Sequence, residues 1–260
     1  MATLSQIFIY PIKSCAGIEV SEARVTARGL QYDRHWMFVD ESGLFVTQRE
    51  EPRMSQIQLS SMPNGFEASF EQKRIHLDPT ELGPLQRVRV WKDEVDAIVC
   101  RPEVNEWFSN VLERPVRLVR MGDDCRRLVD QEFAGADDIV SFADGFSFLL
   151  LSRASLAELD RRMPLAGDVL RFRPNLVIDG VDAHAEDHMG DFSISNIHFR
   201  CVKPCSRCVI PTIDPATGDK EPEINRILSQ YRKFDGKILF GQNLVHKGSG
   251  TLKTGAQIDL

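Results

Sequence analysis

The sequence predicts a mainly β protein, a β-barrel type of fold in which a few helices pack against the strands. Short segments that alternate apolar and polar residues, separated by turn residues, dominate the first hundred positions, which is typical of β-strands. Helical spacing appears in few places and too late to alternate with the strands, so a doubly wound sheet is not expected. Neither glycine-rich phosphate-binding motif, GxGxxG or GxxxxGKS/T, occurs, so nothing supports a dinucleotide or nucleoside triphosphate cofactor.

The first half of the chain reads as strands joined by turns. Two single strands come first, and three pairs follow them, each joined through short polar connections that suit hairpins. The expected strands are Ser5–Tyr10 and Ile18–Thr26, then His35–Asp40 with Leu44–Gln48, Met54–Met62 with Gly65–Phe70, and Val88–Trp91 with Val95–Cys100 across Lys92-Asp93-Glu94.

The first convincing helix is expected at Val104–Leu112. Its apolar residues, among them Trp107 and Phe108, recur at helical spacing, and Pro115 lies beyond its end. A domain boundary is predicted near this point, which divides the chain into residues 1–115 and 116–260.

The second half is expected to contain more strands, two helices and a closing hairpin. A capping-box pattern at Ser155–Glu158 predicts the start of a helix that runs through Met163 and stops at Pro164. The other expected elements are a strand at Val116–Met121, an exposed loop at Arg126–Asp138, an apolar run at Phe146–Leu151, strands at Leu176–Ile178, Phe192–Val202 and Cys208–Ile213, a helix at Glu223–Phe234, and a hairpin at Gly248–Leu260 that closes the barrel.

The composition is that of a soluble globular protein. The 260 residues are 42% hydrophobic, the formal net charge is -6, and the basic residues are scattered, so no nucleic-acid partner is expected. No stretch is apolar for long enough to span a bilayer and the first residues do not form a secretion signal. We therefore expect a cytoplasmic protein without a membrane association, and the lack of heptads favours a monomer.

Three of the six cysteines lie within eight residues, at Cys201, Cys205 and Cys208. Their spacing suits an iron–sulfur cluster, although too few residues follow to build the barrel that normally carries such a motif. A structural zinc would need a fourth ligand, and no histidine pair has the usual spacing. In the third interpretation one cysteine binds a single metal centre, while the other two pack as small hydrophobic residues. Spacing alone does not decide among the three.

Polar residues follow or precede expected strands at three further places. Lys13 and Ser14 come after a strand that ends at proline, and could bind an anion by charge and hydrogen bond. Arg34 has Asp33 beside it, and Arg173 and Asn175 flank a proline. Taken singly, these are equally a solvated strand end, a surface ion pair and a strand-entry turn.

Together, five motifs occur in the order found in one family: YPIKS at Tyr10–Ser14, DRxW at Asp33–Trp36, FADG at Phe142–Gly145, RxRPN at Arg171–Asn175 and CxRC at Cys205–Cys208, the last followed by DPxTG at Asp214–Gly218. The chain resembles the MOSC proteins, in the branch that includes the mitochondrial amidoxime-reducing components and their bacterial relatives. The resemblance extends over nearly the whole length and implies a MOSC N-terminal β-barrel domain followed by a MOSC domain.

The resemblance implies a molybdenum cofactor, a pterin dithiolene with a phosphate tail. Its metal would take Cys208 as the protein ligand and catalytic residue, with Arg207 as a neighbouring cation that favours a thiolate. The residues expected to bind the rest of the cofactor are Lys13, Ser14, Arg34, Arg173 and Asn175, together with Asp144, Gly145 and Ser206.

The reaction implied by the family is the reduction of small N-hydroxylated substrates, with electrons from a separate iron–sulfur or flavin protein. Two other functions remain open at this stage. Cys208 could carry a persulfide as a sulfur carrier, or the chain could bind the molybdenum cofactor and hand it on.

Overall fold

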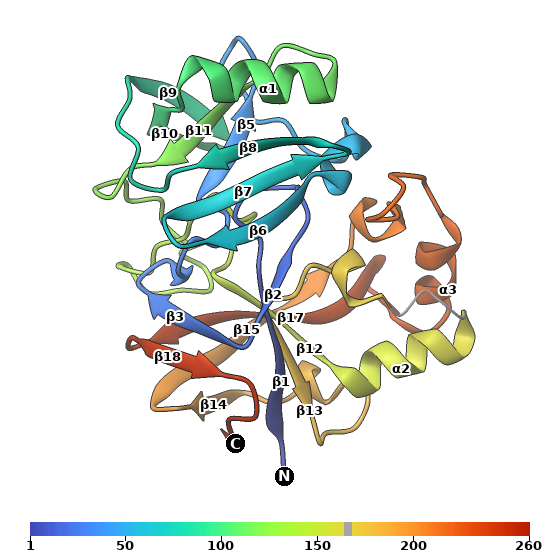
Figure 1. The fold of residues 1–260 in the computed structure, drawn as a ribbon. Helices are drawn as coiled ribbons and strands as arrows, with labels where there is room; N and C mark the ends of the chain where they lie inside the picture. Colours follow the sequence, from blue (N-terminus) through green and yellow to red (C-terminus); the bar gives the residue numbers. More distant parts are fainter. Residues whose placement is uncertain (164–167) are drawn as a thin grey trace.

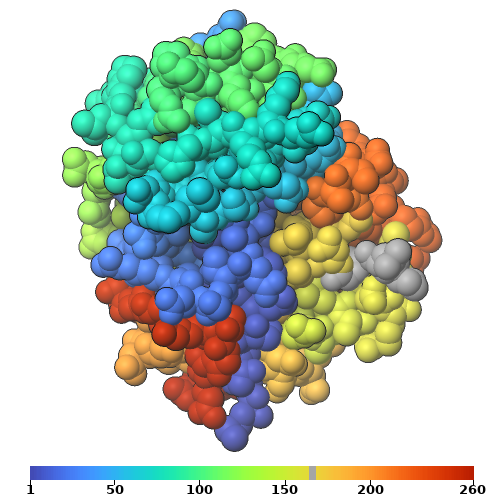
Figure 2. Space-filling model, in the orientation of Figure 1, coloured from blue at the N-terminus to red at the C-terminus, as the bar shows by residue number. Residues whose placement is uncertain are grey.

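The structure, a computed structural model, describes residues 1–163 and 168–260. It consists of two β lobes stacked on each other, with both chain ends at the far end of one lobe (Figure 1). Strands predominate and helices are few, which confirms the mainly β prediction. Figure 2 shows that the N-terminal segment lies in the same lobe as the C-terminal third of the chain.

The larger lobe is built on a nine-stranded sheet in the order β19-β14-β15-β17-β12-β13-β1-β2, with β16 paired to β17. The first strand of the chain therefore lies between the nearby β2 and β13, a strand from the second half of the sequence. The members are β1 (Thr3–Ile9), β2 (Ile18–Val20), β12 (Phe148–Ser152), β13 (Leu176–Asp179), β14 (Asp191–Ile194), β15 (Ile197–Ser206), β16 (Lys233–Phe234), β17 (Lys237–Lys247) and β19 (Ile258–Asp259).

In the described residues, three smaller sheets accompany this one. One is ordered β5-β11-β10-β9 and so joins strands from both sides of residue 115. This sheet consists of β5 (Trp36–Val39), β9 (Leu85–Val90), β10 (Asp93–Val99) and β11 (Arg117–Met121). The second sheet consists of β6 (Gln58–Met62), β7 (Gly65–Phe70) and β8 (Lys73–Leu77), and the third of β3 (Glu22–Thr26), β4 (Gly29–Leu30) and β18 (Gly250–Lys253).

The helices are α1 (Pro102–Leu112), α2 (Arg153–Arg162) and α3 (Glu223–Tyr231), with short 3₁₀ turns η1 (Pro52–Gln56), η2 (Val169–Arg171), η3 (Ala185–Asp187) and η4 (Ile210–Thr212). Helix α1 covers the smaller lobe, whereas α2 and α3 lie at one side of the larger one (Figure 1). No helix in the described ranges is both long and apolar enough to cross a membrane.

One large apolar core extends through both lobes. It includes Leu4 and Ile7 of β1, Trp36 of β5 and Phe108 of α1, all fully buried, together with Phe199 of β15. Because strands from both ends of the chain share this core, segments that are distant in sequence meet at fixed positions between the lobes.

Several expected elements differ from the structure. Cys208–Ile213 is not a strand: β15 ends at Ser206, and the chain turns into η4, where Pro211 has no N–H to offer a ladder. The tail is not a hairpin, since β18 pairs with β3 while β19 pairs with β14. Leu44–Gln48 forms only isolated bridges, one of them between Phe45 and Val39. The strands β8 and β17 were not expected at all.

Helix α2 begins three residues earlier than the capping box predicts. Ser152 is the N-cap, and its hydroxyl accepts a hydrogen bond from the backbone N–H of Ser155 at 3.1 Å. The hydroxyl of Ser155 instead donates to the carboxylate of Glu186 at 2.7 Å, so Ser155 does not act as the cap. Pro164, the expected stop, lies outside the described residues.

Candidate functional site

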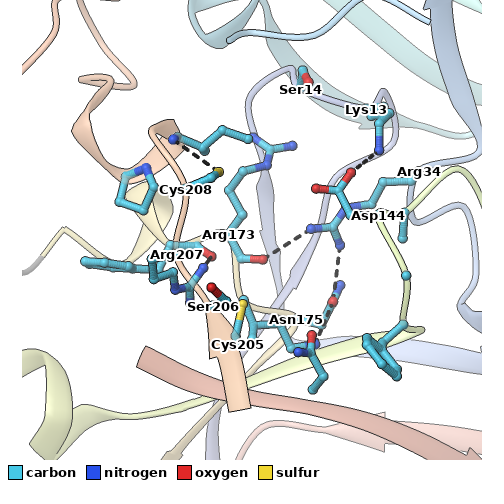
Figure 3. A pocket seen from close by; sticks show the side chains of 18 of the residues that line it. Lys13, Ser14, Arg34, Asp144, Arg173, Asn175, Cys205, Ser206, Arg207 and Cys208 are labelled. Carbon is cyan, nitrogen blue, oxygen red and sulfur yellow. Dashed lines mark hydrogen bonds and ion pairs between the residues drawn. The ribbon is translucent and has the colours of Figure 1, made fainter. Parts of the chain in front are cut away.

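The nine residues expected to bind a cofactor line one pocket between the lobes; Figure 3 labels all of them except Gly145. The pocket holds about 800 Å³ of space free of protein atoms, including the part open to solvent. Five segments supply the nine residues: the turn after β1 (Lys13, Ser14), the turn before β5 (Arg34), the loop before β12 (Asp144, Gly145), the entry to β13 (Arg173, Asn175) and the end of β15 (Ser206, Cys208). Their roles as cofactor contacts stay a prediction.

Lys13 and Asp144 form an ion pair at one wall of the pocket. The ammonium of Lys13 also donates to the carbonyl of Phe142 at 2.7 Å. Burial lowers the pKa of Lys13 to about 8, although Asp144 acts in the opposite direction. Burial alone would raise the pKa of Asp144, but Lys13 and Arg49 hold it well below its usual range. At neutral pH Lys13 and Asp144 therefore form an ion pair. An anionic or proton-accepting ligand in the pocket would contact this pair.

Arg34 and Asn175 connect the two walls. The guanidinium of Arg34 donates to Asp33 at 2.6 Å and to the side-chain oxygen of Asn175 at 3.1 Å. The amide of Asn175 donates to the carbonyl of Phe8 at 3.2 Å, and its oxygen also accepts from the N–H of Leu149. Asn175 is therefore a brace between β1 and β12 as well as a pocket residue.

The guanidinium carbons of Arg34 and Arg173 each lie 4.3 Å from the ring centroid of Tyr10, a cation–π arrangement. Burial raises the pKa of Tyr10 and lowers that of Arg173 to about 10, where nearby Arg34 adds to the lowering. A Cβ on Gly17 would lie 2.4 Å from the ring, so only glycine leaves room for Tyr10 there.

Three site residues have left-handed backbone conformations. The φ angles are 72° for Ser14, 47° for Arg34 and 54° for Arg173, a region that residues other than glycine seldom occupy. Such conformations persist where the surrounding contacts enforce them, and they concentrate at functional sites.

Cys208 lies exposed in the turn after β15. Its sulfur accepts a hydrogen bond from the backbone N–H of Ile210 at 3.5 Å and lies 3.7 Å from a guanidinium nitrogen of Arg49. Arg207 does not supply this contact, because its guanidinium donates to the carbonyls of Phe240 and Phe172. The expected neighbouring cation is thus present, but it comes from a different residue.

Sequence reasoning missed Arg49, Gln48 and Arg127. Arg49 follows an extended segment as Lys13 does, and that signal could have identified it. Gln48 is buried and lines the pocket. Arg127 is also buried, and it donates to the carbonyls of Ser141, Ala143 and Asp144, so it fixes the loop that carries Asp144. Nothing local in the sequence predicts this role, since Arg127 falls in the expected exposed loop.

The pocket has unused hydrogen-bond donors. Within the described part of the chain, one side-chain nitrogen each of Gln48, Arg173 and Arg207 is buried without a partner. Buried donors normally find an acceptor, so the pocket suits a ligand rich in oxygen and nitrogen acceptors. Next to Gly145 nothing lies within 4 Å of a Cβ position, which leaves space for close approach to the backbone. With a thiol at the same pocket, these residues fit a pterin-bound metal.

Within the described residues, Cys201 and Cys205 do not form a metal-ligand set with Cys208. In residues 1–163 and 168–260, no three His, Cys, Asp or Glu side chains come together as metal ligands. Cys201 packs against the large core, and burial raises its pKa to about 12. Cys205 lines the pocket, and burial also raises its pKa. Cys208 is therefore the cysteine of the cluster that is exposed at the pocket.

Comparisons with known proteins agree with these motifs. Residues 1–115 match the MOSC N-terminal beta barrel domain, and residues 137–259 match the MOSC domain. Mitochondrial amidoxime-reducing component 1 of Homo sapiens is 34% identical over an alignment of 282 positions, gaps included. The alignment covers all of this chain and 83% of the human protein. Molybdenum cofactor sulfurase of Danio rerio is 33% identical, covering 95% of this chain but 32% of its own length.

The similarity to the amidoxime-reducing component covers the whole chain and most of that relative, and both parts of the pocket lie within the matched domains. The chain therefore belongs to the MOSC family, in the group in which a MOSC N-terminal β-barrel domain precedes the MOSC domain, and its function is related to the molybdenum cofactor.

Proposed function

We propose that this chain is a molybdenum-cofactor-dependent reductase of small N-hydroxylated compounds, supplied with electrons by a separate iron–sulfur or flavin protein. One observation carries the proposal: an exposed cysteine lies at a pocket in which, within the described residues, three buried side-chain nitrogens have no hydrogen-bond partner. The full-length similarity to the amidoxime-reducing component supports the same reading.

The cofactor, when bound, would supply a metal that passes two electrons to an N–O bond. Cys208 would hold the metal through its sulfur. Lys13, Ser14, Arg34, Arg173 and Asn175 would bind the pterin and its anionic tail, with Asp144, Gly145 and Ser206 as further contacts. The balanced reaction consumes an N-hydroxylated compound, two electrons and two protons, and yields the amine-type product and water.

Lys13 would meet the anionic part of the cofactor with a buried ammonium. Asp144 and the carbonyl of Phe142 hold this nitrogen in place. Arg34 and Asn175 would orient the ligand, because their own positions are fixed by hydrogen bonds on both sides of the pocket.

A second function is favoured by the similarity to molybdenum cofactor sulfurase. In that alternative Cys208 carries a persulfide as a sulfur carrier. A third possibility is a carrier that binds the molybdenum cofactor and releases it to an apo-enzyme.

The test uses protein purified from cells that make the cofactor, with a chemically reduced viologen dye as electron donor and an aromatic amidoxime as probe. The reductase proposal predicts amidine product and retained cofactor in wild type, and loss of the metal or of amidine formation in Cys208→Ser. A sulfur carrier would instead show a mass increase of one sulfur atom on Cys208, removable by reductant. A cofactor carrier would transfer intact cofactor without turnover.

We also propose a cytoplasmic location and a monomeric state. The relatives named as mitochondrial make the location worth testing directly, by fractionation of cells that express the tagged chain. Light scattering of the purified protein tests the monomer.

A further inference from the structure

Trp91 occupies a backbone position that is costly for a large side chain. It is the first residue of the two-residue connection between β9 and β10, since Val90 pairs directly with Asp93. Its φ is 56°, and glycine, asparagine or aspartate are the usual residues at such positions in tight hairpins. A bulky residue with positive φ is an outlier, so other contacts must hold the indole there.

Burial in the core does not provide that compensation, because 44% of the residue is exposed. Three contacts do. The indole N–H donates to the carboxylate of Asp144 at 3.2 Å, the guanidinium carbon of Arg49 lies 5.0 Å from the ring centroid, and the ring of Phe45 lies 5.0 Å away. Two of the three partners belong to the pocket, although Trp91 itself is not part of its lining.

Arg49 depends on such a support. One guanidinium nitrogen contacts both the carboxylate of Asp144, at 3.0 Å, and the sulfur of Cys208, at 3.7 Å. An arginine side chain has many rotamers, and holding it in one costs free energy unless neighbours restrict it. The indole of Trp91 restricts both members of the pair, because it stacks on Arg49 and donates to Asp144.

We propose that Trp91 is a positioning residue that fixes the guanidinium of Arg49 between Cys208 and Asp144. The backbone strain at the hairpin tip is the cost of bringing the indole to the pocket. The effect on turnover rests on the proposed reductase function, whereas the effect on Arg49 and Cys208 does not.

The first test measures the thiol of Cys208 in protein without cofactor. The rate constant of its reaction with iodoacetamide is followed by peptide mass spectrometry at neutral pH for wild type, Trp91→Gly, Arg49→Met and the double variant. A guanidinium nitrogen of Arg49 lies 3.7 Å from this sulfur and Cys208 is exposed, so the alkylation rate reports whether Arg49 keeps this place. We expect Arg49→Met and Trp91→Gly each to change the rate about fivefold in the same direction, and the double variant to change it no further than either single variant.

The thermal stability of Trp91→Gly distinguishes a positioning role of Trp91 from a merely structural one. Glycine removes the strain at φ 56° while the side-chain contacts are lost, so Trp91→Gly should unfold within about 3 °C of wild type. Trp91→Phe keeps a ring for Arg49 but loses the bond to Asp144, and should give an intermediate rate. Trp107→Phe, on α1, is the matched control and should react as wild type.

The proposal is overturned if Trp91→Gly reacts at the wild-type rate, or if the two single effects multiply in the double variant, because Trp91 would then act independently of Arg49. In loaded enzyme the same substitution should lower kcat/KM about fivefold, and not in the Arg49→Met background. Coupling at the thiol without any amidoxime reduction would retain the role of Trp91 and reject the reductase.

Discussion

A guanidinium nitrogen of Arg49 lies 3.7 Å from the sulfur of Cys208, although the two residues are 159 positions apart in the chain. The same nitrogen lies 3.0 Å from a carboxylate oxygen of Asp144. Opposing charges raise the pKa of Arg49 despite its burial. The smaller lobe thus contributes a permanent cation to a pocket whose cysteine comes from the larger lobe.

Removing the charge of Asp144 should destabilise the protein. Asp144→Asn leaves Lys13, which is almost fully buried, and Arg49 without their counter-ion. Because the carboxylate is 53% exposed, solvent reduces the loss, and we expect about 1–2 kcal/mol in urea unfolding. Asp137→Asn, whose carboxylate pairs with Arg126 at the surface, is the matched control and should change stability by less than about 0.5 kcal/mol. Equal effects of the two substitutions would contradict this account.

Asn175→Ala should be one of the more damaging substitutions at the pocket. It leaves the carbonyl of Phe8 and the N–H of Leu149 without their side-chain partner, and burial makes each loss costly. We expect a loss of about 2–4 kcal/mol in urea unfolding. Asn243→Ala also removes a pocket amide, one that donates to the carbonyl of Lys203, and should cost about 1 kcal/mol. A loss at Asn175 no larger than at Asn243 would show that Asn175 does not brace the strands.

Stability should fall in mild acid because of His35. Burial, with a smaller effect from Arg120, lowers the pKa of His35 from 6.5 to about 4. Between these values the unfolded chain binds a proton that the folded chain does not, so the free energy of unfolding decreases as pH falls from 6.5 to 4, by at most about 3 kcal/mol. His35→Phe keeps a ring against Trp36 and should flatten this part of the profile. An unchanged slope in the variant would assign the loss to other groups.

The sequence predicts much of the smaller lobe, because its strands alternate and its turns are local. The helix at Val104–Leu112 is found at Pro102–Leu112, where Pro102 provides the start. The long strand β17 was missed: Gly241, with φ of 82°, interrupts its pattern, and its neighbours β12 and β15 come from far along the chain. In the tail, β18 pairs with β3 and β19 pairs with β14. No local sequence pattern predicts such long-range pairing.

The residues of the site were likewise predicted only in part from the sequence. The motif residues lie together as expected, since each follows or precedes a strand that leads into the same pocket. Arg49 and Trp91 were not predicted, because their importance depends on contacts with Cys208 and Asp144 across the lobe boundary. Arg207 was placed beside the sulfur from adjacency in sequence, but at the end of β15 its side chain bonds to carbonyls instead.

The most direct test of the central claim is the molybdenum content of wild type and Cys208→Ala, measured by elemental mass spectrometry after expression in cells that make the cofactor. Cys205→Ala, a pocket cysteine that burial keeps protonated, is the matched control. We predict about one molybdenum per chain in wild type and in the control, and loss of the metal or of its activity in Cys208→Ala. Iron or zinc in place of molybdenum, or a Cys208→Ala protein that keeps both metal and activity, would contradict the assignment.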